Sequence, residues 1–240
     1  MIDKLSLKQK AAAIGVELDD TALARFDEYA AFLVDYNQNV NLTAITEPED
    51  IVVKHFTDSL SLLPVIDPAQ NAKIADVGAG AGFPSVPLLI ARPDLKITMV
   101  DSSNKRVTFL NLLLEKLELT QSGSQAIHMR AEEAGASPKY REKFDFAVAR
   151  AVANLRELSE YCIPLVKVGG TFASMKGAEI EEELAGAKNA IGTLGGKTER
   201  VEKFTLPNGD GRSVVVIKKI SQTQTKYPRP SAKIAKKPLI

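Results

Sequence analysis

The stretch from Lys73 to Asp101, KIADVGAGAGFPSVPLLIARPDLKITMVD, decides the fold of this chain. Its apolar run at residues 74–77 predicts a strand, the glycines that follow predict a loop, and residues 97–100 predict a second strand after a short helix. Two parallel strands joined by a helix form a right-handed crossover. This crossover places the glycine loop at the carboxyl edge of the sheet, where open α/β folds bind nucleotides. We therefore expect the loop to contact a ligand.

The spacing of the loop residues indicates which ligand. Gly78, Gly80 and Gly82 remove Cβ atoms where a ligand must approach the backbone, and the carboxylate of Asp101 can accept hydrogen bonds from two ribose hydroxyls. The pattern is not the G-x-G-x-x-G of dinucleotide-binding folds, and no Gly-Lys-Ser/Thr of a P-loop follows it. Instead, D-x-G-x-G-x-G, starting at Asp76, resembles the first motif of the class I methyltransferases. These enzymes use S-adenosylmethionine, which we expect as the cofactor.

The composition indicates one large domain, or a core with a small addition. The chain has 240 residues, 45% of them apolar, and a formal net charge of +1, which gives no overall field that attracts nucleic acid. A single cysteine, Cys162, excludes an internal disulfide and fits a reducing compartment. No apolar run approaches the roughly 20 residues that span a bilayer, and the first residues lack a signal-peptide core. We expect a cytoplasmic monomer without membrane contact.

Residues 1–66 are expected to form a helical cap. Residues 6–14 predict a short helix, and a longer helix with one apolar stripe follows it. Thr46 and Glu49 match a T-x-x-E capping box, which predicts a third helix over residues 47–56.

Residues 67–220 are expected to form the sheet domain. Beyond the first two strands, the sequence pattern predicts five more, at residues 125–129, 144–149, 171–177, 198–204 and 213–219. The last two flank a turn-rich PNGDG and suggest an antiparallel pair at the sheet edge. Together these elements predict an α/β fold of the Rossmann-like class I methyltransferase type, with a seven-stranded mixed sheet. Residues 221–240 contain five cations, three prolines and no acid, so we expect a mobile basic tail.

The residues near the fourth strand restrict the group that accepts the methyl. Cys162 lies in an apolar helical setting away from the carboxyl edge, which disfavours the cysteine chemistry of cytosine C5 methylation. The position after the fourth strand reads Ala149-Arg150-Ala151-Val152, not the (N/D)-P-P-(Y/F) of adenine amino-methylating enzymes. No clustered carboxylates follow this strand, so no metal site is expected. Guanine N7 carries a lone pair and no proton, and its methylation requires alignment but no general base.

Motifs across nearly the whole chain make the resemblance specific. They are Asn41-Leu42-Thr43, KHFTDSL at 54–60, DVGAGAGFP at 76–84, Lys105-Arg106, Arg150-Ala151 and Lys176-Gly177. Together they resemble the bacterial 16S ribosomal RNA guanine-N7 methyltransferase family, RsmG, also called glucose-inhibited division protein B (GidB). The resemblance implies a class I core with an N-terminal helical cap. It also implies a partner, 16S ribosomal RNA or the small ribosomal subunit, with one guanine of the decoding-region loop as substrate.

The same resemblance implies roles for individual residues. The cofactor is expected at the glycine loop and at the positions matching the family, which are Gly78, Gly80, Phe83, Asp101, Ala131, Glu132 and Arg150. No residue is expected to act as a general base. Four residues are expected toward the RNA, where they would position the substrate: Asn41, His55, Arg106 and Lys176.

Two other functions remain open on the sequence. An NAD-linked oxidoreductase is compatible with Asp101 but disfavoured by the glycine spacing. A ribosome-assembly factor that binds RNA and retains the fold without activity is the non-enzymatic alternative, because a fold does not prove an activity.

Overall fold

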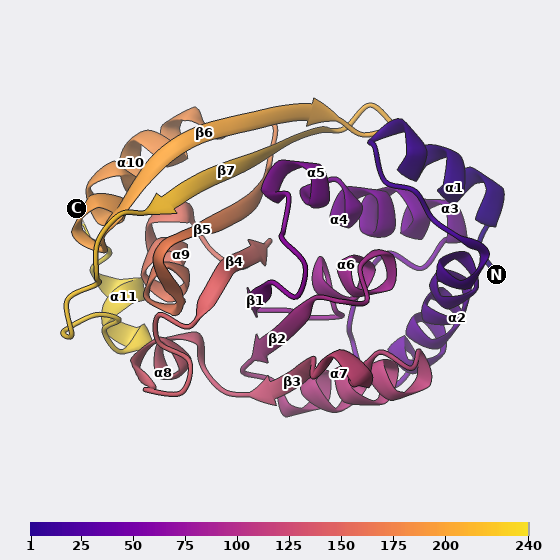
Figure 1. Ribbon diagram of the computed structural model, residues 1–240, viewed down its shortest axis with the longest axis horizontal. Helices are drawn as coiled ribbons and strands as arrows, with labels where there is room; N and C mark the ends of the chain where they lie inside the picture. The colour runs from indigo at the N-terminus through magenta and orange to yellow at the C-terminus, as the bar shows by residue number, and fades with distance from the viewer. Residues whose placement is uncertain (240) are drawn as a thin grey trace.

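The computed structural model describes residues 1–239 as a twisted, mostly parallel sheet with helices on both faces (Figure 1). One sheet holds all seven strands, in the order β3-β2-β1-β4-β5-β7-β6. Their bounds are β1 Lys73–Val77, β2 Lys96–Asp101, β3 Gln125–His128, β4 Phe144–Arg150, β5 Val166–Gly177, β6 Gly196–Thr205 and β7 Gly211–Lys219. β7 is antiparallel to β5 and β6, and the other neighbours are parallel. The predicted seven-stranded mixed sheet is confirmed.

The strand order places two loops at one crevice. β1 pairs with β2 on one side and with β4 on the other, so the connections that follow β1 and β4 diverge from this point. The glycine loop after β1 and the loop after β4 therefore leave the sheet side by side, at its carboxyl edge. Open α/β sheets bind their ligands at such a switch point.

Helices cover the two faces of the sheet in two groups (Figure 1). One face carries α8 Ala131–Ala136, α9 Leu155–Cys162, α10 Glu181–Thr193 and α11 Ser231–Lys236, and the other carries α6 Ser85–Ala91, α7 Asn104–Lys116 and the N-terminal helices. The short 3₁₀ turns η2 Thr120–Ser122 and η3 Ile163–Leu165 join elements. Each group buries its own apolar cluster against the sheet. None of the helices in residues 1–239 is long and apolar enough to cross a membrane.

The N-terminal helices differ in detail from the sequence prediction. Their bounds are α1 Lys4–Ala13, α2 Asp20–Asn37, α3 Pro48–Asp50, η1 Ile51–Thr57, α4 Asp58–Leu60 and α5 Leu62–Ile66. The predicted capping box is wrong, because Glu47 occupies the N-cap and makes no side-chain cap bond. The third helix also runs further than residue 56, and its middle, η1, is a π-helix. Single π turns of this kind are frequent at functional sites.

The C-terminal segment is packed onto the core, which contradicts the expected mobile tail. Tyr227 and Ile234 are buried, and the guanidinium of Arg229 contacts the buried carboxylate of Glu160 on α9. Figure 1 shows the segment leaving β7 and ending in α11, beside α8 and α9. A segment with these buried contacts is part of the folded domain.

Candidate active site

The glycine loop is closed by its own hydrogen bonds. The amides of Gly78 and Ala79 donate to the Val100 carbonyl (2.8 and 3.4 Å), and those of Gly82 and Phe83 donate to the Ala79 carbonyl (2.8 and 3.2 Å). Gly78, Gly80 and Gly82 have φ values of +73°, +60° and +100°. These left-handed conformations favour glycine and allow the tight loop.

Asp101 fixes the loop from the end of β2. Its Oδ2 accepts the amide of Gly80 (2.9 Å) and its Oδ1 accepts the amide of Ser103 (2.8 Å). The guanidinium of Arg106 lies 3.7 Å from Oδ2. Held on three sides, the buried carboxylate has one orientation toward the cavity beside it, and its remaining lone pairs can accept bonds from a ligand.

The N-terminal cap reaches the same loop through Tyr29. The Tyr29 hydroxyl donates to the Ala81 carbonyl (2.5 Å), and the ring stacks on Phe83 with 5.4 Å between centroids. A Cβ built on Gly82 would come within 2.8 Å of the Tyr29 oxygen. The third glycine is therefore required by the cap, since the helix α2 rests directly on the loop.

Asp76, at the end of β1, is a buried acid. It is 1% exposed, and neither carboxyl oxygen has a hydrogen-bond partner among residues 1–239. Burial raises the pKa of Asp76 to about 7, and the charge of Asp101 adds to the effect, while nearby Ser85 and the positive charge of Arg150 oppose it. Because a buried carboxylate without a partner is costly, a nearby cationic group would stabilise its charged form.

A cavity of 290 Å³, here the Asp101 cavity, opens between the ends of β1, β2 and β3. Its lining includes Gly78, Asp101, Arg106, Ala131, Glu132, Val152, Tyr161 and Ser231. The carboxylate at the end of the second strand and the turn into α8 thus face one space. This is the arrangement that an adenosine moiety needs, with ribose at the acid and the base at the α8 turn.

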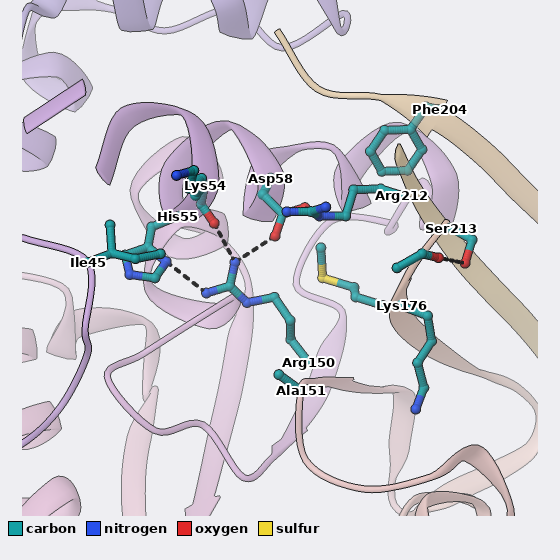
Figure 2. Close-up of a pocket in the computed structure, with 12 residues that line it drawn as sticks. Ile45, Lys54, His55, Asp58, Arg150, Ala151, Lys176, Phe204, Arg212 and Ser213 are labelled. Atoms are coloured by element: carbon teal, nitrogen blue, oxygen red, sulfur yellow. Dashed lines mark hydrogen bonds and ion pairs between the residues drawn. The ribbon is translucent and has the colours of Figure 1, made fainter. Parts of the chain in front are cut away.

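A second cavity of 370 Å³, here the Arg150 cavity, lies beside the start of the loop after β4 (Figure 2). It is lined by Ile45, Lys54, His55, Asp58, Arg150, Ala151, Met175, Lys176, Gly177, Phe204, Arg212 and Ser213. Ala151 lines both cavities and has a φ of +56°. The loop that starts there therefore borders both spaces.

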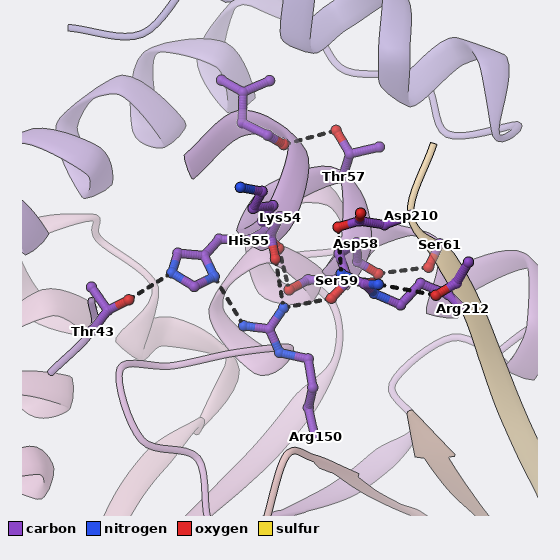
Figure 3. Close-up of polar contacts among 12 residues, drawn as sticks. Thr43, Lys54, His55, Thr57, Asp58, Ser59, Ser61, Arg150, Asp210 and Arg212 are labelled. Carbon is purple, nitrogen blue, oxygen red and sulfur yellow. Dashed lines mark hydrogen bonds and ion pairs between the residues drawn. The ribbon is translucent and has the colours of Figure 1, made fainter. Parts of the chain in front are cut away.

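A hydrogen-bond network holds the guanidinium of Arg150 from the cap side (Figure 3). Nη1 donates to Asp58 Oδ2 (2.6 Å) and to the Lys54 carbonyl (3.0 Å), and Nη2 lies 3.1 Å from Nδ1 of His55. The π-helix contributes, since it directs the amide of Asp58 to the carbonyls of Val53 and His55 and not to that of Lys54. Asp58 also accepts from Arg212 (3.2 Å), and so it joins β4 and β7 to the cap.

His55 is held neutral within this network. Burial and the positive charge of Arg150 lower the pKa of His55 to about 3. Arg150 is always a donor, so Nδ1 accepts, and Nε2 then carries the proton and donates to Thr43 Oγ1 (2.9 Å). The ring also stacks on Phe83 at 4.2 Å. His55 therefore has no lone pair left to act as a base.

Lys176 lines the Arg150 cavity, but its ammonium points away from the guanidinium of Arg150 (Figure 2). Its ammonium donates to the Ala153 carbonyl (2.7 Å) and to Glu183 Oε1 (2.6 Å), and Glu183 also accepts the amide of Leu155. These bonds fasten the end of the loop after β4, at Ala153 and Leu155, to β5 and to the first turn of α10. Lys176 thereby positions the loop that borders both cavities.

Comparison with known proteins gives the family. The family model of rRNA small subunit methyltransferase G, GidB, matches residues 22–213. Proteins named ribosomal RNA small subunit methyltransferase G are 46% identical in Desulforamulus reducens and 49% identical in Acetivibrio thermocellus. The matches cover 98% of this chain and 98% of the first relative, and 97% of this chain and 95% of the second. This chain belongs to the rRNA small subunit methyltransferase G family.

Solved structures with lower sequence identity have the same fold as this chain. An S-adenosylmethionine-dependent O-methyltransferase from Thermotoga maritima matches with a TM-score of 0.53 and 16% identity, covering 80% of this chain and 72% of that one. TrmN from Thermus thermophilus matches with a TM-score of 0.51 and 16% sequence identity, and the match covers 70% of this chain and 53% of TrmN. The class I methyltransferase fold expected from the glycine motif is confirmed.

The structure distributes the expected cofactor residues of this family member over both cavities. Gly78, Asp101, Ala131 and Glu132 line the Asp101 cavity, and Gly80 supports Asp101 from the loop. Phe83 is buried beneath the loop, where the guanidinium of Arg150 lies 4.9 Å from its ring centroid. Arg150 itself faces the Arg150 cavity.

The expected positioning residues are also divided. His55 and Lys176 line the Arg150 cavity, whereas Arg106 lies at the Asp101 cavity. Asn41 is exposed in the segment between α2 and α3 and is not among the lining residues of either cavity.

Among the residues of the site that were not singled out from the sequence, Asp58 and Arg212 join the Arg150 network, and Tyr161 and Ser231 line the Asp101 cavity. Asp58 lies within the KHFTDSL motif, which could have marked it, but it stands in a helical stretch where an acid is usually exposed to solvent. Nothing local distinguishes the other three.

Proposed function

We propose that this chain transfers the methyl group of S-adenosylmethionine to N7 of one guanine in the decoding-region loop of 16S ribosomal RNA. Membership of the rRNA small subunit methyltransferase G family carries the reaction class and the RNA. The observation that supports this site is that Ala151 lines both cavities: the Asp101 cavity, whose lining suits adenosine, and the Arg150 cavity, whose walls hold fixed cations.

The hydrogen bonds of the glycine loop support S-adenosylmethionine and disfavour a dinucleotide. A pyrophosphate is held by free amides at such a loop and at the start of the helix that follows. Here the amides of Gly78, Ala79, Gly80, Gly82 and Phe83 all have internal acceptors. The Asp101 carboxylate is available to bind the ribose, and the turn at Ala131 and Glu132 is available to contact the adenine.

The Arg150 cavity is the proposed place of the guanine. Lys54, Arg150 and Arg212 put three cations at its walls, where Asp58 pairs with both arginines, Asp50 with Lys54 and Asp210 with Arg212. Cations fixed in this way suit the phosphates that flank a target nucleotide. The apolar walls at Ile45, Met175 and Phe204 suit the face of a base drawn out of its stack.

The chemistry requires little acid–base work from the protein. S-adenosylmethionine supplies an electrophilic methyl on a sulfonium. The N7 lone pair forms the new C–N bond while the C–S bond breaks toward sulfur, and no proton leaves N7. The residues of this chain need only align the two reactants and exclude water. A neutral His55 and an arginine fixed by Asp58 fit that task.

We also propose that the protein acts as a cytoplasmic monomer without membrane contact, and that residues 1–66 are a cap on a methyltransferase domain of residues 67–220. The contact of Tyr29 with the glycine loop supports a cap that shapes the cofactor site.

Substitution of Asp101 tests the cofactor site. Asp101→Ala removes a charged acceptor for two hydroxyls, and we expect the affinity for S-adenosylhomocysteine to fall by about 2–4 kcal/mol, roughly 30- to 900-fold. Asp20→Ala, an exposed acid at the start of α2, is the matched control and should leave the affinity unchanged. Calorimetry would measure both, and circular dichroism would verify folding. Unchanged affinity in a folded Asp101→Ala protein would contradict the assignment.

A further inference from the structure

The C-terminal segment, residues 221–237, docks against the two helices that border the Asp101 cavity. Tyr227 is buried in the apolar cluster of α8 and α9, and Ile234 of α11 is fully buried. A Cβ on Gly135 of α8 would come within 3.0 Å of Pro228, which shows how closely the segment approaches that helix. The contact between the segment and these helices is therefore closely fitted as well as apolar.

A buried ion pair fastens the segment to α9. Arg229 donates from Nε to Glu160 Oε1 (2.8 Å) and from Nη2 to Oε2 (2.6 Å), and its backbone amide also donates to Oε1 (2.8 Å). The side chain of Glu160 is 1% exposed and that of Arg229 is 13% exposed. A bidentate ion pair of this kind fixes the orientation of the two side chains as well as the distance between them. Without Arg229, the Glu160 carboxylate would be buried and unpaired.

Arg141 binds the segment to α8. Its Nη1 donates to the carbonyls of Gly135 in α8 (2.9 Å) and Tyr227 (2.7 Å), and its Nη2 donates to those of Thr223 (2.6 Å) and Gln224 (3.3 Å). One guanidinium thus ties three carbonyls of the segment to the helix that begins at Ala131. The segment holds α8 and α9 together from outside.

These contacts lead to the cavity. Ala131 and Glu132 of α8, Tyr161 of α9 and Ser231 of the segment itself all line the Asp101 cavity. Tyr161 directly follows Glu160, so the pair with Arg229 sets the turn of α9 that carries this ring. Burial raises the pKa of Tyr161, and the charges of Glu132, Glu157 and Glu160 add to this effect.

We propose that the docked C-terminal segment completes the cofactor site, with Ser231 as part of its wall and Arg229 as a positioning residue that acts through α9. The inference rests on the proposed function, in which the Asp101 cavity holds the adenosine of S-adenosylmethionine. It assigns the segment to cofactor binding, whereas its composition suggested a mobile basic tail.

The test uses the full-length protein with Arg229→Ala, and with Lys236→Ala as the matched control. Both changes remove one cation from the same segment, but Lys236 is exposed on α11. We expect Arg229→Ala to weaken S-adenosylhomocysteine binding at least tenfold by calorimetry and to speed hydrogen exchange over residues 221–237. In kinetics, KM for S-adenosylmethionine should rise while kcat at saturating cofactor stays near that of the wild type. Lys236→Ala should change none of these.

Ser231→Phe tests the role of Ser231 in the wall of the Asp101 cavity and leaves the ion pair of Arg229 with Glu160 intact. This variant replaces Arg229→Ala in the test if Arg229→Ala does not fold. A phenyl ring at this position enters the cavity or lifts the segment, so cofactor affinity should again fall at least tenfold. A lower melting temperature with unchanged affinity in either folded variant would overturn the inference and leave the segment a stabilising element only. Asp101→Ala, measured in parallel, separates the two proposals. If only Asp101→Ala weakens binding, the cofactor site stands and the role of the segment fails.

Discussion

Gly82→Ala tests the claim that the N-terminal cap shapes the glycine loop. Gly82 has a φ of +100°, and a Cβ there would meet the Tyr29 oxygen and Val86 Cγ2 at 2.8 Å and Leu110 Cδ2 at 3.1 Å. The left-handed backbone costs about 1–2 kcal/mol for alanine, and overpacking of a buried site adds about 1–3 kcal/mol. We expect the free energy of unfolding to fall by about 2–5 kcal/mol.

Gly15→Ala is the control for backbone strain alone. Gly15 has a φ of +79°, and no atom of residues 1–239 lies within 4 Å of the place that a Cβ would take, so only the strain of about 1–2 kcal/mol applies. Urea denaturation followed by far-ultraviolet circular dichroism suits a chain without tryptophan. The difference between the two variants measures the contact with Tyr29, Val86 and Leu110. Equal losses in both variants would refute the reasoning.

Three further outcomes are expected. Burial raises the pKa of Asp76 to about 7, above the unfolded value, so the contribution of Asp76 to stability falls as pH rises from about 4 to 7. Relative to the wild type, Asp76→Asn should gain up to about 1.4 kcal/mol per pH unit over that range and level off above it, whereas a constant difference in urea denaturation would contradict the shift. Because His55 is neutral above a pKa of about 3, single-turnover methyl transfer at saturating cofactor should be flat from about pH 6.5 to 8.5, and a one-proton rise that disappears in His55→Gln would argue against it. Lys176→Ala removes the hydrogen bond to the Ala153 carbonyl, so amide hydrogen exchange over residues 151–155 should accelerate, whereas the control Lys188→Ala, at an exposed position of α10, should leave this exchange unchanged. Equal exchange rates in the two variants would show that the loop does not depend on Lys176.

The sheet could be predicted from the sequence because its signals are local. Most of the strands contain short apolar runs near turn residues, and the glycine loop with Asp101 carries its own spacing. Parallel strands then place their carboxyl ends together, so Gly78, Asp101 and Ala131 were expected to share one region, and they line one cavity.

The features that were not predicted depend on partners distant in the sequence. The composition around Arg229 indicates a solvated cation because its partner, Glu160, lies in another helix, and only the fold shows that both are buried. The π-helix at residues 51–57 follows from tertiary contacts, among them the bond of Arg150 to the Lys54 carbonyl. Lys176 was expected to face RNA, but Glu183 in the next helix draws its ammonium away.

The most direct measurement maps the methyl group on the RNA. Small subunits that lack the modification are incubated with the protein and with S-adenosylmethionine labelled in the methyl group, and the 16S RNA is then treated with borohydride and aniline, which cleave at N7-methylguanine. We predict label in 16S RNA and a single new cleavage at a guanine of the decoding-region loop, absent with Asp101→Ala. Label at a position that resists cleavage, or no transfer by the folded wild-type protein, would contradict the proposed function.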